Sequence, residues 1–294
     1  MTDRKGIALV VLSAVLFSAK AIFVKLAYPY GVDAITLLAL RMAMALPFFV
    51  VIAVVTERRF AGATAGRDRA LVAVLGAVGY WLASFLDYAG LAHVTASLER
   101  VALFSYPTFT VLIDRLVFGR RIGPRAVVAL LLSYAGIAIA LGGEARVSGS
   151  SAVLGTSLVI ASALVYAGYL AGAGRIIPRF GSMRFVSHAL TIACLVVMMH
   201  FAITHPMSAL SVPAPVLGWS ALTAVVSTVI PTLLLGAGIR RVGASEAAIA
   251  GSVGPVSTLV LGAVVLGESV TVARAVGSAL VLVGVTWLSL SRGK

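Results

Sequence analysis

The sequence predicts an all-α membrane protein of ten transmembrane helices, built from two five-helix repeats of inverted topology. First, 61% of the 294 residues are hydrophobic and only 11% are charged, whereas a soluble domain carries about 25% charged residues. Second, apolar runs near the ~20 residues that cross a bilayer as a helix recur along the whole chain. The alternating segments of about 10 residues that are typical of a β-barrel do not occur. Third, the second half of the chain repeats part of the first.

Ten apolar runs are expected to span the bilayer, and short separators with turn-forming residues, such as YPYGVD, divide them. The first run has a basic start, but it is long and lacks a clear cleavage site. We therefore interpret it as a span and not as a signal peptide. No stretch between the runs suits a soluble domain. The expected spans are 6–27, 34–56, 70–93, 96–118, 124–142, 152–173, 183–204, 214–238, 244–266 and 272–291.

The net charge of +13 invites a nucleic-acid-binding interpretation, but the distribution of the basic residues argues against it. Most of them, including Arg58, Arg59, Arg240 and Arg241, fall at one set of alternate span ends. The opposite loops hold Arg146 and little else that is basic. This positive-inside pattern places both termini in the cytoplasm.

The internal repeat has a fixed register of 148 residues. Segments 95–119 and 243–267 share 7 identities in 25 positions, where about two are expected by chance in this composition. We therefore divide the chain into two repeats, 1–147 and 148–294. Because five spans per repeat is an odd number, the second repeat must enter the membrane the other way up, as in many secondary transporters. A duplicated scaffold without transport activity stays open as an alternative.

Several repeated features identify a family resemblance. They are the run ASxxxxxxxxxP…G that starts at 96 and again at 244, Glu268 after Gly267, Gly284, and Arg41. This pattern resembles the EamA repeat of the drug/metabolite transporter superfamily over nearly the whole chain. Within the family the chain resembles the YddG-type amino-acid exporters of bacterial inner membranes, which implies ten spans and export of amino acids. Arg120 departs from the pattern, because it stands where the second repeat has Glu268.

Polar and aromatic side chains share a face in four of the expected spans, as the i, i+4, i+7 spacing of a helix requires. The first span carries Ser13, Phe17 and Lys20, and the sixth carries Ser162 with two tyrosines at equivalent positions. We expect these stripes to line a central cavity. The expected substrate-binding residues are Lys20, Tyr80, Trp81, Ser84, Asp87, Tyr166, Tyr169, Thr228 and Thr232.

Charged residues lie deep in these spans. At ~1.5 Å per residue, Lys20, Arg41 and Asp87 sit roughly 9–12 Å from the outer span boundaries, where charges are costly and mark functional sites. A zwitterion suits such a mixed cluster, with its carboxylate at Lys20 and its amino group at Asp87. The alternative that Lys20 and Asp87 form only a structural pair stays open. The family resemblance places the second span at the periphery of the cavity, so Arg41 is expected to be structural. Glu99 and Arg100 are expected to snorkel to the outer interface.

Pro107 and Pro255 occupy equivalent mid-span positions, where proline disfavours a straight helix. We expect bends there that let the fourth and ninth spans close the cavity. Cys194 and His188 are expected to be packing residues, because neither belongs to a metal or disulfide pattern.

An intramembrane enzyme and a channel are the two alternative classes of protein. An intramembrane enzyme would need a motif such as HExxH, a P-loop or GxSxG, and the sequence has none. A channel would need a filter or a ring of like charges. We therefore expect a broad-specificity exporter of neutral and aromatic amino acids in the bacterial inner membrane, without enzyme activity, cofactor or metal. Its partners are the small-molecule substrate and the lipid bilayer. Export of another small metabolite or a cationic drug stays open, as do proton coupling and oligomeric state.

Overall fold

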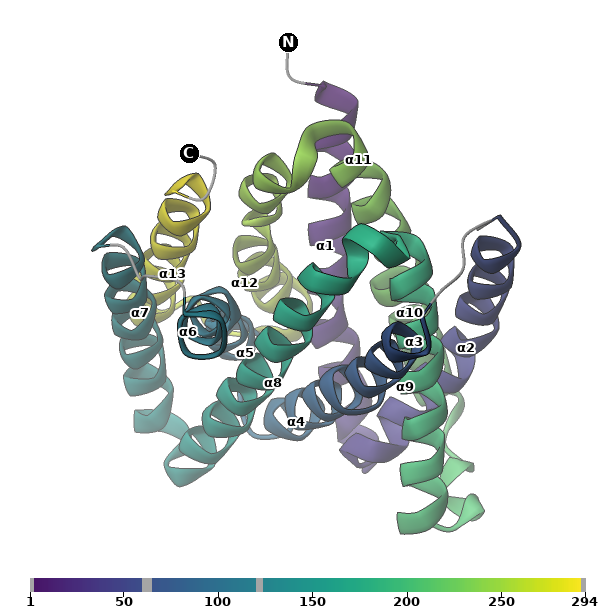
Figure 1. Cartoon of the computed structure of the whole chain (residues 1–294). Coiled ribbons are helices and arrows are strands. Elements are labelled where there is room, and N and C mark those ends of the chain that lie inside the picture. Colours follow the sequence, from purple (N-terminus) through teal and green to yellow (C-terminus); the bar gives the residue numbers. More distant parts are fainter. Residues whose placement is uncertain (1–2, 60–64, 120–123, 292–294) are drawn as a thin grey trace.

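A computed structural model describes residues 3–59, 65–119 and 124–291, and these residues form helices and short connections without any strand (Figure 1). The start of α1 and the end of α13 lie toward the same end of the molecule. The α-helices are α1 Arg4–Ala27, α2 Ala34–Arg59, α3 Gly66–Val74, α4 Trp81–Leu91, α5 Ala96–Leu103, α6 Tyr106–Phe118, α7 Pro124–Ser148, α8 Ser150–Phe180, α9 Ser182–Thr204, α10 Ala214–Ala224, α11 Ile230–Gly251, α12 Val253–Leu266 and α13 Val272–Ser291.

Several helical segments are long and apolar enough to cross a membrane. Within the described residues six qualify by length and composition, and three shorter apolar helices accompany them. The count of ten crossing helices therefore stays a prediction. The six are Arg4–Tyr30, Ala34–Arg59, Gly66–Leu91, Ser150–Phe180, Ser182–Thr204 and Ala214–Gly243, and the shorter ones are Leu130–Ala145, Val253–Leu266 and Val272–Gly284.

Some helices run past the predicted span boundaries. The predicted span 34–56 continues to Arg59, 124–142 continues to Ser148, and 152–173 belongs to a helix that reaches Phe180. Hydropathy ends a span at the first polar residues. The backbone continues as helix because long side chains such as that of Arg175 can extend to the interface from inside a helix.

Four of the predicted spans are interrupted, and the interruptions occur in equivalent places. Single π-helical turns at Leu75–Tyr80 and Val225–Val229 join α3 to α4 and α10 to α11. Helix breaks occur at Phe104 and at Ser252, which are 148 residues apart. Each break lies three residues before a proline, Pro107 or Pro255. The proline therefore sits in the first turn of the following helix, where its missing N–H leaves no hydrogen bond unmade.

The eighth and ninth predicted spans meet at Gly243, which divides α11 in two. Its φ of 83° and ψ of 165° are not helical, and a positive φ is readily adopted only by glycine. The turn lies between the predicted boundaries at 238 and 244, so the chain changes direction there although both sides of it carry the label α11.

The two halves of the chain interlock through matching hydrogen bonds. The Ser13 hydroxyl on α1 donates to the carbonyl oxygen of Pro231 on α11, at 2.8 Å. The Ser162 hydroxyl on α8 donates to the carbonyl oxygen of Ala83 on α4, at 2.7 Å. Adding 149 to Ser13 and 148 to Ala83 gives the other two positions, so the register found in the sequence also relates these contacts.

Helices α7 and α13 lie side by side at one edge of the bundle (Figure 1), and glycine brings their backbones together. A Cβ atom placed on Gly136 would lie 2.5 Å from the carbonyl oxygen of Gly277, and one placed on Gly277 would lie 2.6 Å from that of Gly136. Small residues at such crossings permit the close backbone approach that drives helix association in membranes.

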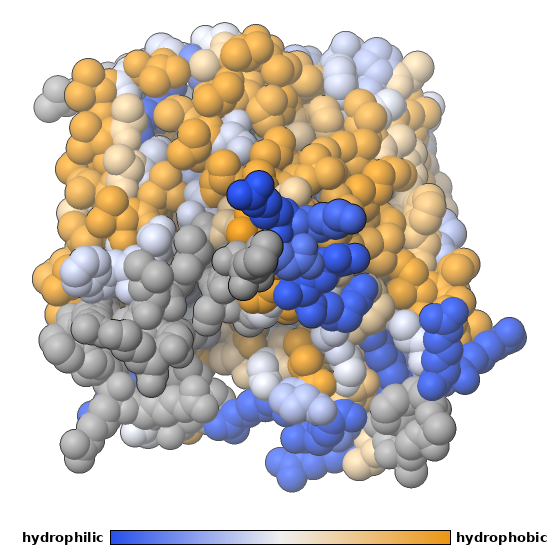
Figure 2. Space-filling view, turned by 90° about the horizontal axis from the view of Figure 1, so that it is seen from above, coloured by the Kyte–Doolittle hydropathy of each residue, from blue (hydrophilic) through white to orange (hydrophobic). Residues whose placement is uncertain are grey.

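Ion pairs tie together helix ends that carry exposed arginines. Arg241 pairs with Asp3 at 3.2 Å, and Arg179 pairs with Asp68 at 2.7 Å. Figure 2 shows one face of the molecule, on which hydrophilic groups in blue lie beside extensive apolar areas in orange. Exposed pairs of this kind contribute little stability, so they reflect where the basic helix ends lie more than what holds the bundle together.

We predict that Gly136→Ala lowers the free energy of unfolding by about 1–3 kcal/mol, because the new methyl group overpacks a backbone contact. Gly142→Ala, on the same helix α7, is the matched control, since nothing lies within 4 Å of a Cβ at Gly142. Thermal unfolding of the purified protein in detergent would test this. Equal melting temperatures for the two variants would contradict the proposed close contact.

Candidate functional site

Three buried charged residues from three helices meet near the centre of the bundle. The ammonium of Lys20 on α1 forms an ion pair with Asp87 on α4 and donates to Glu99 Oε1 on α5 at 3.0 Å. Their side chains are 12%, 6% and 0% exposed. The structure thus brings Lys20 and Asp87 together, as their similar depth in the spans suggested, and adds a second carboxylate to them.

This Lys20–Asp87–Glu99 cluster is not fully satisfied. One ammonium faces two carboxylates, and Asp87 Oδ1 and Glu99 Oε2 have no hydrogen-bond partner among the described residues. Leaving buried carboxylate oxygens without donors is expensive. The cluster can therefore accept a further hydrogen-bond donor, such as an ammonium group or a proton.

Glu99 and Arg100 do not snorkel to the interface, contrary to the expectation from the sequence. Glu99 is 0% and Arg100 8% exposed. The Arg100 guanidinium donates to Thr258 Oγ1 at 3.1 Å and to the carbonyl oxygen of Phe17 at 3.0 Å. Both residues lie in the first turns of α5, and the start of that helix is covered by other parts of the chain.

Two glutamates cover the start of α5. Glu268, just after α12, accepts hydrogen bonds from the backbone N–H of Ala96 at 2.7 Å and from the Ser97 hydroxyl at 2.6 Å. Glu144 on α7 accepts from the Thr95 hydroxyl at 2.6 Å and from Arg274 at 3.2 Å. Carboxylates are favourable at a helix N-terminus, because they satisfy its free N–H groups and its partial positive charge. Glu268 therefore caps the start of α5. Arg120, the equivalent position in the first repeat, lies outside the described residues.

Arg41 is also buried, at 4% exposure, and it is not peripheral. Its guanidinium donates through Nε to Thr228 Oγ1 at 3.0 Å, and through its two terminal nitrogens to the hydroxyls of Tyr88 and Tyr80, each at 3.3 Å. It thus joins two predicted substrate-binding residues, Tyr80 and Thr228. Thr232 lies one turn further along and donates to the Thr228 carbonyl oxygen at 2.6 Å.

A series of aromatic rings runs through the bundle from α5 to the π-helical turn before α4. Ring centroids lie 5.9 Å apart for Phe104 and Tyr106, 5.3 Å for Tyr106 and Tyr166, 5.8 Å for Tyr166 and Tyr169, and 5.8 Å for Tyr169 and Tyr80. The structure therefore places three of the predicted aromatic residues in one row. It also adds Tyr106, which lies next to Pro107 and gave no periodic signal in the sequence.

The Trp81 ring packs against another helix and not against this row. The Trp81 indole donates to His200 Nδ1 on α9 at 3.3 Å, and the two rings meet edge to face. Ser84 is partly buried on α4. Among the packing residues expected from the sequence, Cys194 is buried with its sulfur 3.5 Å from that of Met42. No group of three potential metal ligands occurs in the described part of the chain.

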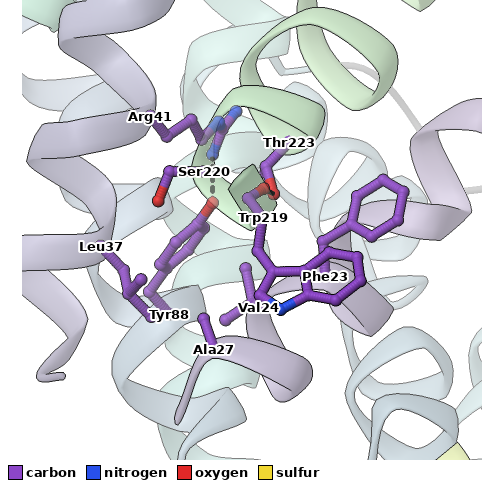
Figure 3. Close-up of a pocket in the computed structure, with 9 residues that line it drawn as sticks. All are labelled: Phe23, Val24, Ala27, Leu37, Arg41, Tyr88, Trp219, Ser220 and Thr223. Carbon is purple, nitrogen blue, oxygen red and sulfur yellow. Dashed lines mark hydrogen bonds between the residues drawn. The ribbon is translucent and has the colours of Figure 1, made fainter. Parts of the chain in front are cut away.

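A small pocket adjoins Arg41 (Figure 3). Leu37 and Arg41 come from α2 and Tyr88 from α4, and Trp219 and Ser220 come from α10. The remaining lining residues are Phe23, Val24 and Ala27 of α1 and Thr223 of α10. No pattern in the sequence predicts this pocket, because its lining comes from segments that are far apart along the chain.

Comparisons with known proteins were made for the whole chain. The profile of the EamA-like transporter family matches residues 4–142 and again 153–290. A protein of Bacillus subtilis (strain 168), the uncharacterized transporter YcbK, is 30% identical over 298 residues, covering 98% of this chain and 95% of its own. A crystal structure with 18% sequence identity superposes with a TM-score of 0.68 over 97% of this chain and 96% of that one, which indicates a shared fold.

The family matches together cover most of the sequence, and the relative is similar from end to end. The helices found here are long and apolar enough to cross a bilayer several times. The chain therefore belongs to the EamA-like transporter family and is a multi-pass membrane transporter.

Proposed function

We propose that this transporter exports amino acids, aromatic and other neutral ones, across the bacterial inner membrane. The observation that carries the proposal is the Lys20–Asp87–Glu99 cluster, and a row of aromatic rings in the same bundle accompanies it. Charged groups of both signs match the two ends of a zwitterion, and aromatic walls match a range of apolar side chains. The direction of transport rests on the resemblance to amino-acid exporters.

In this proposal the substrate's amino group binds where Asp87 Oδ1 and Glu99 Oε2 lack donors. The sequence assigned the substrate's carboxylate to Lys20. Since Lys20 is held by two carboxylates, a substrate carboxylate there would have to displace one of them.

Alternating access requires that two halves of the protein rock about a central site. We assign these halves to residues 1–147 and 148–294, with ten spans in total and both termini in the cytoplasm. Matching hydrogen bonds, π-helical turns and helix breaks in the two halves support this division.

A cationic drug is the second candidate substrate, because the cluster holds two carboxylates near aromatic rings. Lys20 counts against it, since its ammonium neutralises one of the carboxylates and repels a second cation.

Purified protein in liposomes should take up labelled Phe, Thr and Met, and much less of a cationic dye. Uptake should exceed that of empty liposomes and saturate with concentration. Repeating the assay with and without a pH gradient shows whether protons are coupled to transport. Uptake of the dye alone would show that the protein transports a cation and would contradict the proposal that it transports amino acids.

Neutralising the cluster should separate its structural and functional roles. Lys20→Met leaves two buried carboxylates without their cation, which should cost roughly 3–5 kcal/mol of stability. Asp87→Asn should lower stability less and still reduce amino-acid uptake, because the amide carries no charge to attract an amino group. Asp68→Asn, at an exposed ion pair, is the control. Normal uptake by a folded Asp87→Asn variant would argue that the pair is only structural.

We predict that Pro107→Ala and Pro255→Ala slow transport by allowing the broken helices to straighten. The binding affinity for substrate should change little, because neither ring contributes a polar group to the cluster. Initial uptake rates and equilibrium binding, measured on the same preparations, would check this. Unchanged uptake rates in both variants would show that the two prolines have no role in the transport cycle.

A further inference from the structure

Arg41 is a buried cation that has no carboxylate partner among the described residues. Its three hydrogen bonds all go to neutral hydroxyl groups, and its guanidinium lies 5.5 Å from the centroid of the Tyr88 ring. A guanidinium stays charged at any accessible pH and carries five N–H donors. Each terminal nitrogen of Arg41 uses only one of its two donors on a tyrosine hydroxyl.

Unpaired charge of this kind is costly in a bundle interior. Taking an ion out of water costs several kcal/mol, and neutral hydroxyls offset that only in part. The carboxylate on the neighbouring helix, that of Asp87, is already bound by Lys20. Arg41 therefore retains both charge and donors that a ligand could use.

A second polar group beside Arg41 also lacks a partner. Ser220 on α10 is 3% exposed, and its hydroxyl makes no hydrogen bond to any described residue. It lines the same pocket as Arg41, and Figure 3 draws the two side chains close together. A buried unpaired hydroxyl costs free energy until a ligand or water satisfies it.

Apart from the hydroxyl-bearing Tyr88 and Thr223, the other residues that line the pocket are apolar or aromatic. Val24, Ala27 and Leu37 form part of its wall. Phe23 and Trp219 stack with centroids 6.0 Å apart at its edge. An anion with an apolar tail therefore suits this lining better than a hydrated inorganic ion does.

We propose that the Arg41 pocket binds a small carboxylate, held by the free donors of Arg41 and by the Ser220 hydroxyl. Arg41 forms the planar fork that matches a carboxylate. A phosphate dianion would require more than one cation, and an amine would be repelled. Resting on the proposed function, we infer further that this pocket holds the carboxylate of the exported amino acid, while Asp87 and Glu99 hold its amino group.

The pocket is narrow, with room for about one water-sized group. Only the carboxylate end of a ligand can therefore enter it, and an apolar tail would lie against the lining residues at its opening. Tyr80 accepts a hydrogen bond from Arg41. Tyr80 is also the end of the aromatic row.

The test compares three probes of similar shape: isovalerate, leucine and isoamylamine. A ligand that binds only the folded state raises its melting temperature. Isovalerate and leucine should each raise the melting temperature of the purified protein in detergent, and isoamylamine should raise it much less. Arg41→Gln should weaken isovalerate binding on the order of tenfold or more. Arg41→Lys should recover only part of the affinity, because it keeps the charge without the fork.

Ser220→Ala is a second test variant, which can be measured even if the Arg41→Gln protein does not fold. It should weaken isovalerate binding several-fold, whereas Ser227→Ala should leave it unchanged. Ser227 is the matched control, because its hydroxyl is also buried and unpartnered but does not line the pocket. No shift with isovalerate in the wild-type protein, or shifts in Arg41→Gln and Ser220→Ala as large as that of the wild type, would overturn the site.

Leucine transport separates this inference from the proposed function. An Arg41-dependent shift with isovalerate, without any leucine transport, would leave the carboxylate site standing and remove the proposed function. Leucine transport by Arg41→Gln with an unchanged KM would support the proposed function and would show that the Arg41 pocket does not bind the carboxylate of leucine.

Discussion

Lys20 holds three helices together by a set of charges that the bundle interior makes expensive to separate. Its contacts with Asp87 and Glu99 link α1 to α4 and α5. Moving an ion out of water costs several kcal/mol, and the attraction between Lys20 and its two carboxylate partners offsets this cost only while they stay in contact. Any movement of these helices therefore requires that each carboxylate exchange Lys20 for another partner. If the cluster is the proposed substrate site, its conformation and its occupancy are linked for this reason.

How far the sequence predicts this architecture depends on the range of the interactions. Hydropathy predicts helical segments well, because the bilayer requires backbone groups to be satisfied within each segment. An offset of 149 residues, one more than that of the main repeat, predicts Ser13 and Ser162 as equivalent, and both make the same kind of inter-helix hydrogen bond. The depth of Glu99 was beyond this reasoning. It depends on Glu268 covering the start of α5 from 172 positions away, and no local pattern reveals such a contact.

Arg41 illustrates the same limit for a candidate site. The family resemblance suggested a peripheral structural role, because it places the second span at the edge of the cavity and does not say which face of that helix Arg41 occupies. Its environment is set by Thr228, which follows it by 187 positions, and by two tyrosines from the third span. The π-helical turn ending at Tyr80 shifts the helical phase between α3 and α4, which a fixed period of 3.6 residues does not anticipate.

The Lys20–Asp87–Glu99 cluster lacks hydrogen-bond donors and the Arg41 pocket lacks an acceptor, and this difference determines which ligand could stabilise both. Among the residues that the structure describes, two buried carboxylate oxygens at Asp87 and Glu99 lack donors, and no carboxylate accepts from Arg41. Asp87 and Tyr88 are consecutive residues of α4, and Tyr88 accepts a hydrogen bond from Arg41, so the two regions adjoin through one helix. A cation would relieve only the first region and an anion only the second. A zwitterion supplies both groups and adds no net charge to the interior, which makes it the ligand of lowest electrostatic cost for this bundle.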